Sequence, residues 1–239
     1  MNDRPLLEKI AVVTGASRGI GLAIAQALAA AGCKLALCAR NTRFIPDKDI
    51  ADQNDVPVLV GECDVRNEAS VNGFFRAVQD RYTKIDFLIN NAGTAHPAAT
   101  IDRLPLDDWR DAIETNLTGM FLCTRAALPM INPGGAIVNN LSIAARNAFT
   151  GQAGYIAAKH GAKGFTDTLR EELRSRNMRV IGLLPGATDT DIWNIFWPDA
   201  PREKMISPET VAQAVMNVLN LPDTAAVEEI VLASTSGRL

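Results

Sequence analysis

The sequence is poor in the residues that build metal sites, disulfide frameworks and membrane anchors. Its 239 residues include two His and four Cys, and no two Cys form a C-x-x-C pair. Each thiol lies in or beside an apolar run, so we interpret Cys33, Cys38, Cys63 and Cys123 as buried free thiols in a reducing compartment. No apolar run is long enough to span a bilayer. The first residues carry an acid where a signal peptide needs basic residues before an apolar stretch.

An excess of charge of one sign is also absent. Lys and Arg number 24 against 27 Asp and Glu, which gives a net charge of −3. Nucleic-acid binding usually requires a basic patch or stripe, and this composition does not suggest one. Hydrophobic residues make up 47% of the chain and supply the material for a sizeable core. We therefore expect a soluble, cytoplasmic protein with no metal and with neither a nucleic acid nor a membrane as partner.

Short apolar runs alternate with longer segments of helical periodicity. The runs are almost continuously hydrophobic, as in strands that helices cover on both faces, and lie at residues 10–13, 35–38, 58–60, 87–89, 136–138, 180–184 and 230–232. Helical periodicity covers residues 20–31, 69–81, 107–130, 153–176 and 208–219. The polar stretch 41–55 is expected to hold only a short helix. No linker or repeat divides the chain.

This alternation predicts βαβ units with right-handed crossovers. We expect one domain over residues 1–239, an α/β fold with a Rossmann-like doubly wound parallel sheet of about seven strands and helices on both faces. In such sheets the ligand lies beyond the carboxyl ends of the strands. The residues that follow each apolar run are therefore the candidates for chemistry.

A glycine-rich turn follows the first apolar run and leads directly into a helical segment. It reads Thr14-Gly15-Ala16-Ser17-Arg18-Gly19-Ile20-Gly21. Backbone N–H groups and the helix dipole at such a turn can bind a pyrophosphate. The spacing is G-x-x-x-G-x-G, for which a plain tight turn is the alternative. Its place at the first strand–helix junction favours a nucleotide.

Two cations follow the first two apolar runs. The second run ends in Ala39-Arg40, where an acid would bind the ribose 2′-OH of NAD and an Arg would accommodate the 2′-phosphate of NADP. Arg18, inside the glycine turn, adds a second positive charge. Either Arg could be an ordinary surface charge. Two of them at the ribose end favour NADP(H) as the cofactor.

Several motifs together resemble those of the short-chain dehydrogenase/reductase family. They occur in the family's order and spacing between about residue 9 and residue 186: the turn at 14–21, Asn90-Asn91-Ala92-Gly93, Asn116, Ser142, Tyr155-x-x-x-Lys159 and Pro185-Gly186. The resemblance implies an NADP(H)-dependent oxidoreductase that acts on a small-molecule ketone, aldehyde or alcohol. It also implies a homodimer or homotetramer, in which the helices around 107–130 and 152–176 form a four-helix bundle across a dimer.

The Tyr-x-x-x-Lys spacing also has a chemical meaning that does not depend on the resemblance. Tyr155 and Lys159 are four residues apart and would share one face of a helix. A phenol titrates near pH ~10. An ammonium beside it, together with the positive nicotinamide of the oxidised cofactor, is expected to lower the pKa of Tyr155 toward the working pH.

By resemblance, four residues are catalytic. Tyr155 gives its proton to the carbonyl oxygen, Ser142 hydrogen-bonds that oxygen, and Lys159 also holds the nicotinamide ribose. Asn116 would support a water-linked proton path to Lys159. The structural alternatives are a half-buried aromatic for Tyr155, a turn cap for Ser142 and a surface cation for Lys159. Asn116 would lie in the middle of a helix, a position where Asn is unfavourable without a reason.

The resemblance also assigns the rest of the site. Asp64 and Val65 would flank the adenine, and Asn91, Ala92 and Gly93 would lie along its ribose, although turn chemistry is an alternative for such residues. Pro185, Gly186 and Thr190 would lie beside the nicotinamide carboxamide. The cofactor set is completed by Gly15, Ser17, Arg18, Gly19, Ile20, Gly21, Arg40, Tyr155 and Lys159. The expected substrate residues are Ile143, Phe149, Trp193, Phe196 and Trp197. His96 and His160 have no Ser or Cys partner at a recognisable spacing, and we interpret both as structural.

The segment 189–206 is longer than a typical βα loop. Its first part is apolar, with two Trp and a Phe, and its second part is polar. We expect a mobile lid that closes its apolar face over the nicotinamide and a largely apolar substrate. The alternative is a short amphipathic helix packed permanently on the core.

Two departures from the family pattern bear on the substrate. Leu141 stands where many relatives have a further Ser, which leaves the catalytic hydroxyl in place. Residues 229–239 lack the Gly-rich ending that is common among 3-oxoacyl thioester reductases of the family, which argues against a role in fatty-acid synthesis. We therefore expect a ketone or aldehyde reductase, with a 3-oxoacyl thioester reductase as the alternative. A non-catalytic NADP(H)-binding sensor or regulator is the alternative of another class, and the intact catalytic motif argues against it.

Overall fold

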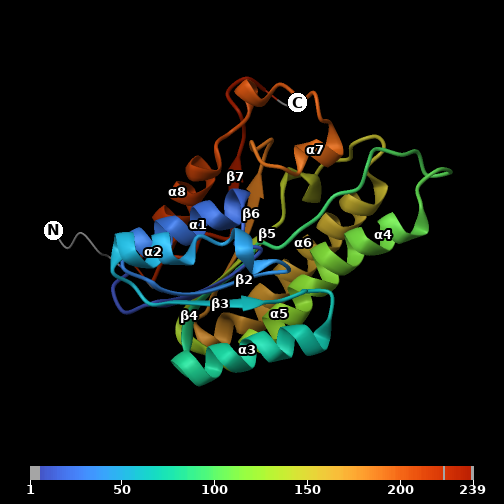
Figure 1. Cartoon of the computed structure of the whole chain (residues 1–239). Coiled ribbons are helices and arrows are strands. Elements are labelled where there is room, and N and C mark those ends of the chain that lie inside the picture. Colours follow the sequence, from blue (N-terminus) through green and yellow to red (C-terminus); the bar gives the residue numbers. More distant parts are fainter. Residues whose placement is uncertain (1–5, 223, 238–239) are drawn as a thin grey trace.

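A single sheet forms the centre of the computed structural model, which describes residues 6–222 and 224–237. Its strands lie in the order β3-β2-β1-β4-β5-β6-β7, and every neighbouring pair runs parallel. Helices cover both faces (Figure 1). The chain builds the sheet outward from β1 in one direction and from β4 in the other, so strand order reverses between them. The predicted fold class is confirmed.

Each predicted apolar run lies in a strand. The strands are β1 (Ile10–Thr14), β2 (Lys34–Ala39), β3 (Val58–Glu62), β4 (Ile85–Asn90), β5 (Ile131–Asn140), β6 (Arg179–Pro185) and β7 (Glu229–Leu232). The beginning of β5 differs most from the prediction, because Asn-Pro-Gly-Gly at 132–135 has the composition of a turn. There β5 pairs with β4 through an irregular register, from Ile85↔Ile131 directly to Phe87↔Ala136. The sequence pattern therefore missed the first five residues of β5.

The helices follow the predicted periodicity except at one place. They are α1 (Gly19–Ala30), α2 (Asp47–Asn54), α3 (Glu68–Tyr82), α4 (Leu106–Ile113), α5 (Gly119–Ala127), α6 (Ala153–Leu173), α7 (Trp193–Phe196) and α8 (Pro208–Leu219). The short helices η1 (Thr42–Phe44), η3 (Ile143–Ala145), η4 (Arg174–Arg176) and η5 (Arg202–Lys204) connect them. None of the described helices is long and apolar enough to cross a membrane.

The exception is the helix expected over residues 107–130. A π-helical turn, η2 (Glu114–Thr118), separates α4 from α5, and the last residues to 130 form turns. The prediction of one regular helix is therefore wrong in this detail. The π-turn is centred on Asn116, and such turns frequently occur at functional sites.

Two layers of helices bury the two faces of the sheet. On one face, α1, α2 and α8 contribute apolar side chains such as Ile24, Ile50 and Val215 to a common cluster with the strands. On the other face, α3, α5 and α6 contribute side chains such as Phe74 and Leu169 to a second cluster. Both layers are close-packed, which leaves the carboxyl edge of the strands as the open part of the fold.

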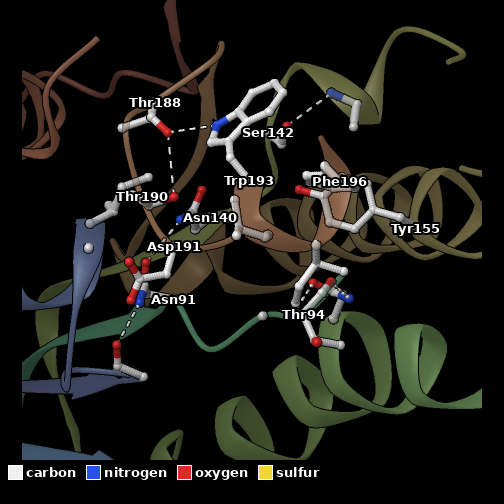
Figure 2. A pocket seen from close by; sticks show the side chains of 18 of the residues that line it. Asn91, Thr94, Asn140, Ser142, Tyr155, Thr188, Thr190, Asp191, Trp193 and Phe196 are labelled. Atoms are coloured by element: carbon white, nitrogen blue, oxygen red, sulfur yellow. Dashed lines mark hydrogen bonds between the residues drawn. The ribbon is translucent and has the colours of Figure 1, made fainter. Parts of the chain in front are cut away.

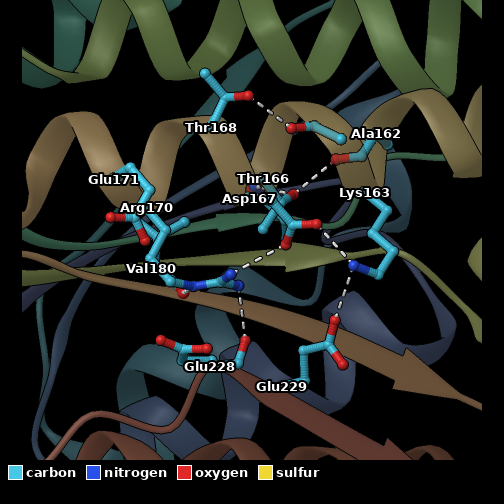
Figure 3. A network of polar contacts seen from close by, with 12 residues as sticks. Ala162, Lys163, Thr166, Asp167, Thr168, Arg170, Glu171, Val180, Glu228 and Glu229 are labelled. Atoms are coloured by element: carbon cyan, nitrogen blue, oxygen red, sulfur yellow. Dashed lines mark hydrogen bonds and ion pairs between the residues drawn. The ribbon is translucent and has the colours of Figure 1, made fainter.

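An ion network fixes α6 to the edge strand β7 (Figure 3). Lys163 lies 2.7 Å from Asp167 and 3.3 Å from Glu229, and Arg170 lies 3.0 Å from Asp167. Arg170 also donates to the carbonyl oxygen of Val180 at 3.0 Å. Because α6 carries two of the predicted catalytic residues, this network contributes to holding them in place.

Candidate active site

One cleft, with a volume of about 910 Å³, runs along the carboxyl edge of the sheet. It is lined by residues that follow β1 to β6, with the segment after β6 forming one wall (Figure 2). Every predicted catalytic, cofactor and substrate residue lines it except Gly21. Residues scattered from 15 to 197 are thus brought to one place by the parallel sheet.

The glycine turn forms one end of the cleft. Gly15 and Gly19 have φ angles of +64° and +56°, a conformation that a side chain would strain. The α1 helix begins without a side-chain cap and without an acid in its first turn. Its first N–H groups therefore remain available to an anion, as a pyrophosphate requires. This cradle fits a dinucleotide.

Gly21 lies behind this turn rather than in the cleft. It is buried, and a Cβ at this position would overlap the Asn91 carboxamide and the Gly15 carbonyl. Asn91 in turn donates to the carbonyl oxygens of Thr14 and Gly15, each at 3.1 Å. The third glycine thus lets α1 pack closely against the loop after β4.

Three Arg side chains line the adenosine end of the cleft. Arg18 pairs with Asp191 at 3.2 Å, from across the cleft. Arg66 pairs with Asp64 at 2.7 Å, and this guanidinium lowers the pKa of the Asp64 carboxyl below its usual value. Arg40 is exposed and makes no ion pair with any described residue. Arg40 is therefore the cation available to a phosphate, whereas Arg66, which sequence reasoning missed, neutralises Asp64.

Tyr155 and Lys159 lie on one face of α6, as predicted from their spacing. Both are buried, with exposed fractions of 8% and 4%. The Lys159 ammonium lies 5.6 Å from the centre of the Tyr155 ring and donates to the carbonyl oxygen of Asn140 at 2.7 Å. A buried ammonium with a single carbonyl acceptor and an open cleft beside it has donors to spare for a ligand.

Ser142 projects into the same cleft from the loop after β5. Its φ of +74° is unusual for a residue with a side chain, and its Oγ accepts from the N–H of Ala144 at 3.2 Å. Strained backbone of this kind clusters at functional sites. The Ser142 hydroxyl also hydrogen-bonds Tyr155, so both side chains converge on one place in the cleft. The capping role considered as an alternative is present together with this contact.

Burial governs the electrostatics of the Tyr155–Lys159 pair. Burial raises the pKa of Tyr155 to about 12, and the Ser142 hydroxyl lowers it only in part. Burial also lowers the pKa of Lys159 to about 7. Burial therefore dominates the pKa values of both groups in this structure. The expected lowering of the Tyr155 pKa by the ammonium together with the oxidised nicotinamide stays a prediction for the cofactor-bound protein.

Asn116 occupies the π-turn between α4 and α5 and is 1% exposed. Its amide donates to the carbonyl oxygens of Ala112 and Thr94, at 2.8 and 2.9 Å. Its Oδ1 lies 2.9 Å from where a Cβ of Gly93 would be, and Lys159 Nζ lies 3.8 Å from the same point. Asn116 thus hydrogen-bonds one carbonyl group of α4 and one of the loop after β4, and it lies close to Lys159.

The segment 189–206 covers the other end of the cleft. Its short helix α7 places Phe196 edge-on to Tyr155, with ring centres 4.9 Å apart. Trp193 donates from Nε1 to the carbonyl oxygen of Thr188 at 2.9 Å (Figure 2). Arg202 pairs with Asp189 at 2.9 Å and bridges the two ends of the segment. The predicted substrate residues Ile143, Phe149 and Trp197 also line this end.

Two buried polar atoms of the cleft lack any hydrogen-bond partner among the described residues. They are Thr115 Oγ1 and Gln152 Oε1. Buried polar groups are nearly always paired, so these two atoms are exceptions among the side chains of the cleft. No sequence motif marks either residue. The same holds for the further lining residues Phe44, Thr94, Asn140, Thr150, Ser234 and Gly237.

Comparison with known proteins agrees with this architecture, a doubly wound dinucleotide fold with a Tyr–Lys pair at the open edge of its sheet. Residues 9–200 match the sequence model described as short chain dehydrogenase. The chain belongs to the short-chain dehydrogenase/reductase family. It is 39% identical over 191 residues to a 3-oxoacyl-[acyl-carrier-protein] reductase of Synechocystis, covering 78% of this chain and 77% of that protein. It is 35% identical to carbonyl reductase family member 4 of Danio rerio, covering 90% and 93%.

Solved structures agree with this family assignment. An alcohol dehydrogenase from the archaeon Thermococcus sibiricus, in complex with 5-hydroxy-NADP, superimposes with a TM-score of 0.91 at 33% identity. The match covers 97% of this chain and 99% of that one. A metagenomic short-chain oxidoreductase in complex with NADP gives a TM-score of 0.85 at 28% identity, with the same coverage.

Proposed function

We propose that this protein reduces a ketone or an aldehyde, or oxidises the matching alcohol, with NADP(H) as its cofactor. The observation that carries the proposal is the convergence of buried Tyr155 and Lys159 with the Ser142 hydroxyl, beside a cradle that fits a dinucleotide. Family relatives named as reductases of carbonyl compounds support the same reaction class.

In this proposal the side chains divide the work on the carbonyl oxygen. NADPH, when bound, supplies the hydride. Tyr155 donates its phenolic proton to the oxygen, and Ser142 donates a hydrogen bond to the same atom as negative charge develops there. The Lys159 ammonium lies 5.6 Å from the centre of the ring that then carries the negative charge. Burial keeps Tyr155 protonated across neutral pH, which is the form that can give a proton to the carbonyl oxygen.

The preference for NADP(H) rests on Arg40. It lines the adenosine end of the cleft, and no described acid pairs with it, whereas Arg18 and Arg66 are engaged by Asp191 and Asp64. Neighbouring structures solved with NADP or 5-hydroxy-NADP support this choice. In the bound state we place the pyrophosphate at the glycine turn and the 2′-phosphate at Arg40.

The test is turnover of NADPH with a panel of carbonyl compounds, followed by loss of the reduced-nicotinamide absorbance. Tyr155→Phe is the matched variant, because it removes only the hydroxyl. We expect turnover to fall by about 10²–10⁴-fold while NADPH binding, measured by titration, changes little. A Tyr155→Phe enzyme that kept most of its turnover, with chemistry rate-limiting, would overturn the assignment.

The second candidate is reduction of a 3-oxoacyl thioester, which the Synechocystis relative favours. The panel should therefore include acetoacetyl-CoA beside simple ketones and aldehydes. A kcat/KM for the thioester far above that of every simple ketone would establish this alternative. Tight NADPH binding with no turnover on any substrate would instead favour the sensor or regulator.

We further propose that the chain acts in the cytoplasm as one domain and as a homodimer or homotetramer. The α4–α5 and α6 region exposes apolar side chains, among them Leu106 and Phe121 at 57% and 41%. Phe121 packs edge-on against Phe165 of α6. Static light scattering after gel filtration tests the assembly, and a purely monomeric mass would contradict it.

A further inference from the structure

We propose that Glu229 is a positioning residue for the reaction. Its carboxylate holds the loop of Ser142 and the helix of Tyr155 in the relative arrangement that carbonyl reduction requires. Glu229 belongs to the edge strand β7 and does not line the cleft, so it acts through other residues and not on the substrate. This inference rests on the proposed function and adds to it a residue that places the catalytic groups.

The two groups that act on the carbonyl oxygen come from different segments of the chain. Ser142 follows β5 and caps the short helix η3, whereas Tyr155 lies in the first turn of α6. Residues 146–151 connect the two segments, and none of them is buried. A displacement of about 1 Å between reacting groups can lower a rate by about 10²-fold. The relative placement of η3 and α6 therefore matters for the reaction.

The Glu229 carboxylate contacts both segments. It forms an ion pair with Arg146, the residue that directly follows η3. It also lies 3.3 Å from Lys163 of α6 (Figure 3). Lys163 comes about two helical turns after Tyr155 on the same helix. One carboxylate thus joins the end of the Ser142 loop to the helix that carries the proton donor.

The sheet leaves room for this carboxylate beside the Ser142 loop. Glu229 pairs with Gly182 of β6 in the parallel register. A Cβ at position 182 would lie 3.5 Å from Glu229 Cγ and 3.0 Å from a methyl group of Leu141, the residue before Ser142. Because Gly182 has no side chain, Glu229 can pass beside β6 and reach the two cations.

A short turn connects Arg146 to Ser142. Arg146 N–H donates to the carbonyl oxygen of Ile143 at 3.0 Å, and Ala145 N–H donates to that of Ser142 at 3.1 Å. Ser142 Oγ accepts from Ala144 N–H at 3.2 Å. Because these hydrogen bonds close one turn over residues 142–146, a shift of Arg146 is passed on to Ser142.

Stability alone does not account for this arrangement. The side chains of Arg146 and Glu229 are 46% and 18% exposed. Ion pairs this close to solvent add little to the stability of a fold. The two ion pairs of Glu229 are therefore expected to contribute more to the placement of the two segments than to the free energy of unfolding.

The experiment measures the single-turnover rate of NADPH oxidation with the best carbonyl substrate of the panel, together with the Kd and the stoichiometry of NADPH binding. Glu229→Gln removes the charge and keeps the shape of the side chain. Glu228→Gln is the matched control, because Glu228 is exposed and its 2.9 Å contact with Arg170 uses the backbone carbonyl oxygen, which the substitution keeps. Arg146→Gln and the variant with both Arg146→Gln and Glu229→Gln complete a double-mutant cycle.

Glu229→Gln should lower the single-turnover rate per NADPH site by about tenfold, while the Kd and the stoichiometry of NADPH binding change by less than about twofold. Arg146→Gln should lower the rate by about threefold or more. The double variant should be no slower than Glu229→Gln, because residues that act through one contact have non-additive effects. Glu228→Gln should keep the wild-type rate.

Several outcomes would overturn the inference. One is an unchanged rate per NADPH site in Glu229→Gln, since a merely structural role would reduce the number of folded sites and not the rate at each site. Another is a double variant in which the losses of the two single variants multiply, because Glu229 then does not act through Arg146. If Glu229→Gln fails to fold, a wild-type rate in Arg146→Gln has the same meaning.

In all these cases carbonyl reduction itself still stands. If no carbonyl compound is reduced with NADPH by the wild type, the proposed function fails, and this inference fails with it.

Discussion

The buried ammonium of Lys159 makes the stability of the protein depend on pH in a way that can be calculated. Burial lowers the pKa of Lys159 to about 7 in the folded protein, whereas a Lys in water titrates near 10.4. Between these values the unfolded chain binds more protons than the folded one, so stability rises with pH. Below the folded pKa the ammonium is charged in both states, and its desolvation weakens the fold in full.

The magnitude follows from the two pKa values. One pKa unit corresponds to about 1.4 kcal/mol, and linkage gives a rise of about 2–3 kcal/mol in the free energy of unfolding from about pH 6 to about pH 9. Tyr155 does not contribute in this range, because its pKa rises to about 12 from an already high value. Lys159→Met removes the titrating group and should remove this rise.

The assay is urea unfolding of the cofactor-free protein, followed by Trp fluorescence at several pH values. The difference between wild type and Lys159→Met cancels the other titrating groups. Lys84→Met is the matched control, since Lys84 also donates to a backbone carbonyl, that of Pro129 at 3.1 Å, but is exposed. The difference in unfolding free energy between wild type and Lys84→Met should not change with pH to a comparable extent. If the difference between wild type and Lys159→Met were also independent of pH, the claim that desolvation governs this ammonium would be refuted.

Three further predictions follow from the described contacts. Arg40→Ala should weaken NADPH binding by about tenfold to a hundredfold and NADH binding little. Arg43→Ala, exposed and outside the cleft lining, is the control, and equal losses for both cofactors would contradict the role of Arg40. Gly21→Ala should lower the free energy of unfolding by about 1–3 kcal/mol, whereas Gly73→Ala, with open space around its Cβ, should raise it by about 0.5–1 kcal/mol. Urea unfolding checks both, and equal effects would show that close packing behind the turn is unimportant. Residues 191–204 should exchange amide hydrogens faster than β6 and α8, and slower once NADPH and a substrate analogue are added. Strong protection throughout the segment in the empty enzyme would rule out a mobile lid.

Local patterns were sufficient to predict the layout of the fold. Continuous apolar runs marked every strand, because a strand covered on both faces buries each side chain in turn. The spacing of Tyr155 and Lys159 predicted their common face, since helical geometry repeats within a few residues. The glycine turn was also predictable, because its conformation is a property of a few adjacent positions.

What surrounds each side chain was decided by the tertiary structure alone. Arg18 pairs with Asp191 across 173 positions of sequence, and Arg66 pairs with Asp111 across 45, so neither contact has a local signal. The Tyr155 pKa rises because distant segments of the chain bury the phenol. The unpaired oxygen of Gln152 likewise depends on which groups the folded chain brings near it. Desolvation and long-range pairing depend on the whole packed environment of a side chain, and that environment exists only once the chain has folded.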